Sequence, residues 1–69
     1  MNKKQIEQIL EEYINIEIQT PLYTSNQINA KDIDFPFEGV LRISNKVMNE
    51  PHVYLQIKDI KIIKGVVKR

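Results

Sequence analysis

The chain has few of the side chains that carry chemistry. Its 69 residues include one histidine, His52, and no cysteine. His52 therefore has no partner for a nucleophile–base pair or for a strong metal site. The one carboxylate cluster, Asp32, Asp34 and Glu38, lacks the glycine and the ligand spacing of a calcium loop. A chain this short also rarely encloses a catalytic pocket, so we expect no enzyme, no cofactor and no small-molecule substrate.

Basic residues gather in the second half of the chain. Residues 1–35 carry three lysines against six carboxylates, whereas residues 36–69 carry seven basic side chains against three carboxylates. As phosphate contacts, the basic residues would bind RNA without reading its sequence and with a strong dependence on salt. As lysines on the edge of a sheet, they would instead deter pairing between sheets, and we favour this interpretation. The residues concerned are Lys58, Lys61, Lys64, Lys68 and Arg69.

The start of the chain predicts an amphipathic helix over residues 2–14. Apolar residues recur at i, i+3, i+4 and i+7, which places them in one stripe. Asn2 is followed three residues later by Gln5, the pattern of a capping box. The stripe needs a surface to pack on, and the strands that follow supply it. It consists of Ile6, Ile9, Leu10 and Tyr13.

Three later segments alternate apolar and polar residues with the period of two that predicts a half-buried strand. A glycine inside the second segment, Gly39, indicates a bulge, a sharp bend or a close backbone approach. After Asp59 the chain stays apolar up to Gly65, so either a bend at Asp59 separates two strands or one long strand curls through it. The segments are residues 14–19 with Ile14, Ile16 and Ile18 on one face, residues 37–44 with Phe37, Gly39, Leu41 and Ile43 on one face, and residues 53–58.

Residues 21–36 are the least regular part, and a structureless loop of this length is uncommon in a compact domain. Either the segment holds a short strand around 22–23 or 28–33, or it is a functional loop. Together the patterns predict a single α+β domain over residues 1–69. We expect an N-terminal helix followed by a small, strongly bent antiparallel sheet of four to five strands, or a partly open barrel, with the helix across one end or face.

The centre of the chain resembles the Sm-like family of small oligomeric RNA-binding barrels with an N-terminal helix. The first family motif runs Gly-x-Leu, three residues, Asp, two residues, Met-Asn. Here Gly39-Val40-Leu41 is followed by Asn45 and then by Met48-Asn49 at that spacing. The second motif, Arg-Gly after an apolar pair, is similar to Ile62-Ile63-Lys64-Gly65, with lysine for arginine. The chain departs from the family pattern at Glu50-Pro51-His52, which delays the next apolar strand.

The resemblance implies an SH3/Sm-like partly open barrel that binds RNA. The family's base contacts would fall on Asn45, Met48, Asn49 (or His52), Lys64 and Gly65. The alternative interpretation takes the asparagines as turn formers and Gly65 as the end of a strand. With the nearby basic residues included, the candidate nucleic-acid-binding residues are Arg42, Asn45, Asn49, His52, Lys58, Lys61, Lys64 and Gly65.

The function that we expect first is a non-catalytic binding or adaptor module that acts through protein contacts and self-associates. A small core, a strand-rich sequence with open edges and opposite charge in the two halves favour it. The alternative is an RNA-binding Sm-like barrel, and a third is a small inhibitor encoded by a mobile element. No apolar run approaches the ~18 residues that span a bilayer, and the N-terminus lacks the apolar region of a signal peptide. We therefore expect no membrane contact and a cytoplasmic location.

Overall fold

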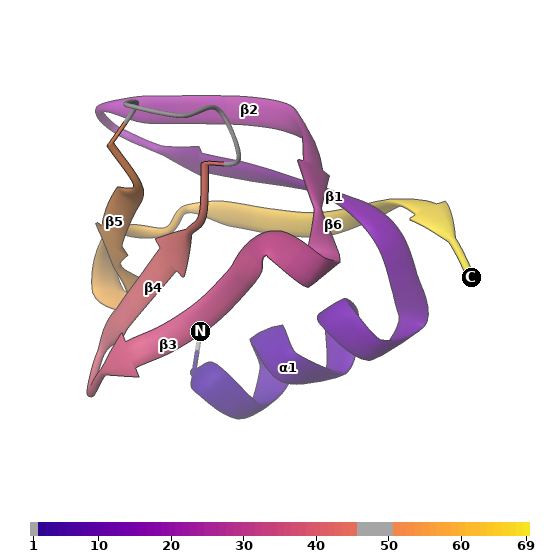
Figure 1. The fold of residues 1–69 in the computed structure, drawn as a ribbon, viewed down its shortest axis with the longest axis horizontal. Helices are drawn as coiled ribbons and strands as arrows, with labels where there is room; N and C mark the ends of the chain where they lie inside the picture. Colours follow the sequence, from indigo (N-terminus) through magenta and orange to yellow (C-terminus); the bar gives the residue numbers. More distant parts are fainter. Residues whose placement is uncertain (1, 46–50) are drawn as a thin grey trace.

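The computed structural model describes residues 2–45 and 51–69 and has one helix and six antiparallel strands (Figure 1). The strands form two three-stranded sheets, with the orders β2-β1-β6 and β3-β4-β5. Two short 3₁₀ helices, η1 and η2, lie between strands. The elements are α1 (Lys3–Glu12), β1 (Tyr13–Thr20), β2 (Tyr23–Asn29), η1 (Ala30–Asp32), β3 (Ile33–Phe37), β4 (Val40–Ile43), β5 (Val53–Gln56), η2 (Ile57–Asp59) and β6 (Ile62–Lys68).

The predicted helix and its capping box are confirmed. The Asn2 side chain accepts a hydrogen bond from the Gln5 backbone N–H at 3.0 Å, and the Gln5 side chain accepts one from the Asn2 N–H, also at 3.0 Å. The helix ends at Glu12, two residues before the predicted end, because the chain enters β1 directly. Its apolar stripe packs against the core, and Ile6 is completely buried.

The C-terminus returns to the end of this helix. The Arg69 backbone N–H donates to the Glu12 carbonyl at 3.0 Å, and the Arg69 guanidinium donates to the Leu10 carbonyl at 3.3 Å. The last carbonyls of a helix have no partner within the helix. Arg69, which comes directly after β6, therefore satisfies two of the carbonyls at the end of α1.

One core lies between the two sheets and the helix. It is made almost entirely of isoleucine, a β-branched residue that suits strands. Both sheets and α1 contribute to it, so neither sheet has a separate core. Its buried residues are Ile6, Ile16, Ile18, Ile28, Ile33, Leu41, Ile43, Ile57, Ile60 and Ile63.

The predicted inward position of Ile14 is wrong. Ile16 and Ile18 are completely buried, but Ile14 is 42% exposed. The pairing of β1 with β6 shifts its register twice between Tyr13 and Ile16, which breaks the alternation at this point. The half-buried Tyr13 side chain packs against the core instead.

The single strand predicted over residues 37–44 is a hairpin. β3 ends at Phe37 and β4 begins at Val40, and these two residues pair with each other. Gly39 lies in the turn with a φ of +73°, a conformation that L side chains rarely adopt. Leu41 and Ile43 point into the core as predicted, whereas Phe37 is 67% exposed because it precedes the turn.

Residues 21–36 are mostly strand, and they carry the chain from one sheet to the other. A two-residue turn at Pro21 and Leu22 joins β1 to β2, and η1 then connects β2 to β3. Pro36 lies inside β3, which is tolerated because β3 is at the edge of its sheet. At Asp59, η2 makes the bend that separates β5 from β6. The strands therefore number six where four or five were expected, and the strands that the structure describes form no closed barrel.

Ile16 is buried and Ile14 is exposed, so the effect of shortening each side chain tests the β1 register. Ile16→Val should lower the free energy of unfolding by about 0.5–1.5 kcal/mol, because it removes a fully buried methylene. Ile14→Val, the matched control, should change it by less than ~0.5 kcal/mol because the side chain is partly in water. Urea unfolding measures both. Equal effects would show that the alternation continues through Ile14.

Candidate functional site

Arg42 forms an ion pair across the β3–β4 ladder. Its Nε donates to Oδ1 of Asp34 at 2.8 Å, and its terminal Nη2 donates to Oδ2 of the same carboxylate. This hydrogen bond is the main cause that lowers the pKa of the Asp34 carboxyl below its ordinary value of 3.8. The same bond, with a further one to Tyr54, raises the pKa of Arg42 above its usual range. The Arg42 guanidinium is therefore already engaged by neighbours in its own sheet.

Asn45 and His52 are close together, at the two ends of the segment that joins β4 to β5. The Asn45 backbone N–H donates to Nδ1 of His52 at 2.9 Å, which holds the ends of the segment near each other. Asn49, with Met48, lies outside the described residues. The histidine ring thus has a structural contact in this protein.

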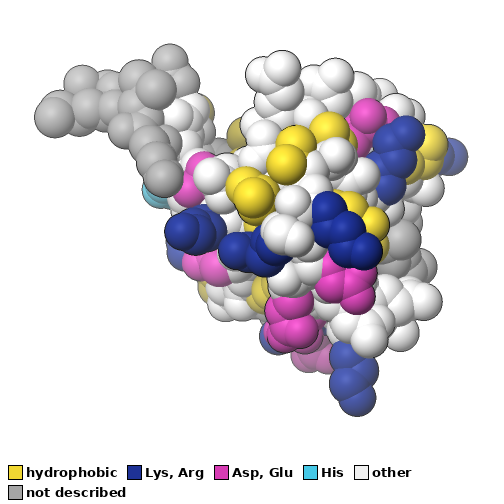
Figure 2. Space-filling model, turned by 90° about the vertical axis from the view of Figure 1, so that its right-hand side faces the viewer, with side chains coloured by type: hydrophobic (Ala, Val, Ile, Leu, Met, Phe, Trp, Pro, Cys, Tyr) yellow, Lys and Arg dark blue, Asp and Glu magenta, His cyan; other side chains and the backbone are white. Residues whose placement is uncertain are grey.

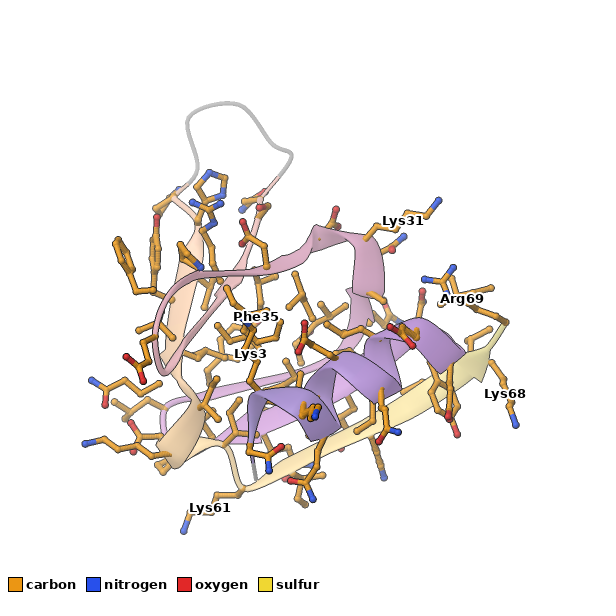
Figure 3. All side chains as sticks on the ribbon, turned by 90° about the horizontal axis from the view of Figure 1, so that it is seen from below. Lys3, Lys31, Phe35, Lys61, Lys68 and Arg69 are labelled. Carbon is orange, nitrogen blue, oxygen red and sulfur yellow. The ribbon has the colours of Figure 1, made fainter. Side chains whose placement is uncertain are left out.

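Three of the four lysines of the C-terminal region lie in β6 or directly before it, and the fourth lies in the 3₁₀ helix η2. Lys58 is in η2, and Lys64 is in the middle of β6, where its Nζ lies 3.9 Å from a carboxylate oxygen of Glu17. Lys61 and Lys68 lie at opposite ends of β6 (Figure 3). Arg42 belongs to the other sheet. The structure therefore places Lys61, Lys64 and Lys68 along one strand, with Lys58 in η2 and Arg42 in the other sheet.

In the folded protein, the basic residues of the second half of the sequence lie among the acidic residues of the first half. The pairs Arg42–Asp34 and Lys64–Glu17 each join a basic residue of the second half to an acid of the first. Figure 2 shows basic and acidic side chains interspersed on the face that it presents. The sequence asymmetry therefore does not give this face a single sign of charge.

Gly65 lies inside β6, and the strand continues beyond it to Lys68. The ring of Tyr13 covers it so closely that a Cβ atom at this position would lie 2.1 Å from Cδ1 of the ring. Only glycine allows this contact without a shift of the ring or the strand. Gly65 thus has a packing role, and the interpretation of Gly65 as the end of a strand is wrong.

The edge strands β5 and β6 carry exposed apolar side chains, and the sequence analysis did not locate them. β5 and β6 are each the last strand of a sheet, so the described strands pair with only one side of each. Tyr54 on β5 is 53% exposed, and Val66 on β6 is 50% exposed, with Ile62 and Val67 nearby. Finding them requires the strand order, which a single sequence does not give.

A groove runs along β5. It has a volume of about 570 Å³ and lies between β5 and the turn that joins β1 to β2. Leu22, in that turn, is 99% exposed. Asp59 is the one charged residue in the lining, which is otherwise apolar or neutral: Thr20, Pro21, Leu22, Tyr23, Val53, Tyr54, Leu55 and Gln56.

A second groove lies between the start of α1, the β3–β4 turn and η2. Its volume is about 700 Å³, and it combines the aromatic rings of Phe35 and Phe37 with two lysines, Lys3 and Lys58, and one acid, Glu38. The Lys3 Nζ lies 5.1 Å from the centre of the Phe35 ring, within the range of a cation–π contact (Figure 3). Rings beside cations can stack on a planar group and attract an anion.

Other classes of site find no support in residues 2–45 and 51–69. No group of three or more histidine, cysteine or acidic residues there is placed to hold a metal ion. No helix in the same residues is long and apolar enough to cross a membrane. No family model matches the chain, and no curated protein or solved structure is similar enough to be matched to it.

The Asp34–Arg42 pair should make the stability of the protein depend on acid pH. Because the folded pKa of Asp34 is lowered, the pair stabilises the protein fully above the unfolded pKa, and this contribution is lost as the pH falls through the folded pKa. Asp34→Asn should therefore reduce the fall in stability below about pH 4. Urea unfolding at a series of pH values measures this. Arg42→Met should give the same reduction, and an unchanged slope in either variant would contradict the assignment.

The contact between Tyr13 and Gly65 can be tested with a double-mutant cycle. Gly65→Ala should destabilise the protein by about 1–3 kcal/mol, because the new methyl group overlaps the ring. In a Tyr13→Ala background the same change should cost much less, since the ring is absent. Unfolding free energies of the four proteins give the coupling. A cost of Gly65→Ala that is independent of Tyr13 would rule out the steric explanation.

Proposed function

We propose that this chain is a small non-catalytic binding module that acts through protein–protein contacts and self-associates by pairing of strand edges. The observation that carries the proposal is that the edge strands β5 and β6, one in each sheet, each have a second edge without a partner among the described strands and carry exposed apolar side chains. Pairing with another strand replaces water at the edge with backbone hydrogen bonds and covers apolar surface. The two together are the usual basis of strand-to-strand association.

The size of the core supports association. A chain of this length buries a smaller fraction of its surface than a larger domain, so its stability is limited. Burial of the exposed groups on β5 or β6 in an assembly would add to that stability, because binding of the folded state shifts the folding equilibrium.

We also propose that the two sheets form an SH3/Sm-like partly open barrel, with β2, η1 and β3 as one strongly bent strand that belongs to both sheets. What supports this is the order of pairing, in which β2 pairs with β1, β3 pairs with β4, and β6 returns to β1. The Ser44 N–H also donates to the Asp32 carbonyl at 2.7 Å, so the β3–β4 contact extends into η1. The shared core fits the same interpretation.

Light scattering tests self-association directly. The chain has a mass of 8.1 kDa, so the purified protein should show at least twice this mass at concentrations of tens of micromolar and should dissociate on dilution. High salt should leave the association largely intact, because apolar contacts and backbone hydrogen bonds are little screened. A mass of one chain at every concentration would contradict self-association.

RNA binding is the second candidate, and the groove lined by Lys3, Phe37 and Lys58 favours it. If the groove binds unpaired RNA, the affinity for a short single-stranded RNA should fall steeply as salt rises. Phe37→Ala should weaken binding about tenfold, the effect of losing one stacked base, whereas Tyr54→Ala should not. Fluorescence anisotropy with a labelled RNA measures both. Absence of binding at low salt would exclude this candidate.

A further inference from the structure

We infer that two copies of this chain associate through β5, with the β5 strands paired antiparallel across a two-fold axis. The inference rests on the proposed self-association and names the surface that mediates it. Two observations carry it: β5 is an edge strand without charged side chains, unlike the edge strand β6, and an apolar groove runs along it.

The edge of β6 is unsuited to pairing with a second copy of itself. Lysines stand just before the strand, in its middle and at its end, at positions 61, 64 and 68. Lys64 remains largely exposed although its Nζ lies 3.9 Å from Glu17. A second β6 would bring the lysines of both copies along the same edge, and like charges that face each other across strands destabilise the pair. Lysines on an edge strand are a common means of preventing such pairing.

The edge of β5 has the opposite properties. Residues 53–56 carry no charged side chain, so a second copy of the strand meets no repulsion within the strand itself. The groove along β5 adds apolar surface, with Tyr54 on the strand and Leu22 at the turn opposite. Pairing through β5 places the grooves of the two copies next to each other. The Leu22 side chain, almost wholly in water in one copy, then lies at the contact.

A two-fold axis follows from the use of one surface by both copies. An interface that pairs a strand with the same strand of a second copy is isologous, and the two strands then run antiparallel. The sheet β3-β4-β5 would continue into its mate and become a sheet of twice the number of strands. Because a two-fold interface uses the same edge of both copies, the association through β5 is complete at two copies and does not continue into a filament.

Matched charge insertions on the two edges test the inference. Tyr54→Lys puts a lysine in the middle of β5, and Val66→Lys puts one on β6 at a position of similar exposure. Sedimentation equilibrium should show that Tyr54→Lys raises the dimer dissociation constant at least tenfold, whereas Val66→Lys leaves it within about twofold. Leu22→Asp is a second β5-side variant at a side chain that makes little contact within the fold. Circular dichroism confirms that each variant is folded.

A cysteine cross-link tests the contact independently of charge. The chain has no cysteine, so Tyr54→Cys introduces a single thiol near the proposed axis, and mild oxidation should give a covalent dimer. Val66→Cys should give little dimer under the same conditions.

The outcomes separate the inference from the proposed function. Loss of the dimer in Val66→Lys, with Tyr54→Lys and Leu22→Asp unaffected, would overturn the assignment to β5 and leave self-association in place. An assembly larger than two that needs both edges would overturn the two-fold arrangement. A protein that is a single chain at every concentration would overturn both proposals.

Discussion

The architecture depends on one shared core of isoleucine side chains. Each sheet has three strands and one apolar face, and α1 has one apolar stripe, so none of them can bury its apolar surface alone. η1 and η2 let the chain turn from one sheet to the other while Ile57 and Ala30 stay buried. Because all three elements meet at the same residues, loss of any one of them would expose the rest.

The open edges of β5 and β6 follow from the small number of elements in the described residues. The single helix covers the apolar core, and the described residues include no further element to cover β5 or β6. The protein protects one of these edges with lysines and leaves the other uncharged beside an apolar groove. This difference makes the edge of β5 better suited than that of β6 to pair with another strand.

Local patterns in the sequence were enough to predict α1, its capping box and the inward residues of β5. The hairpin at Gly39 was not recognised, because a glycine within an alternating pattern fits a bulge as well as a turn. Ile14 was misplaced because a register shift depends on the partner strand, which lies far away in the sequence. Of the candidate site, the ion pair of Arg42 with Asp34 and the two grooves depend on the strand order, and no single segment contains that information.

The pairing of β1 with β6 has a consequence for synthesis of the protein. β1, the central strand of its sheet, has β6 as a neighbour, and Tyr13 pairs with Lys68. β1 therefore gains its second partner only after β6 has been synthesised. Until then the isoleucines of β1 remain partly uncovered, and folding has to close almost the full length of the chain in one loop. Such long-range pairing slows folding, because the entropy of closing the loop must be lost before the contacts between β1 and β6 form.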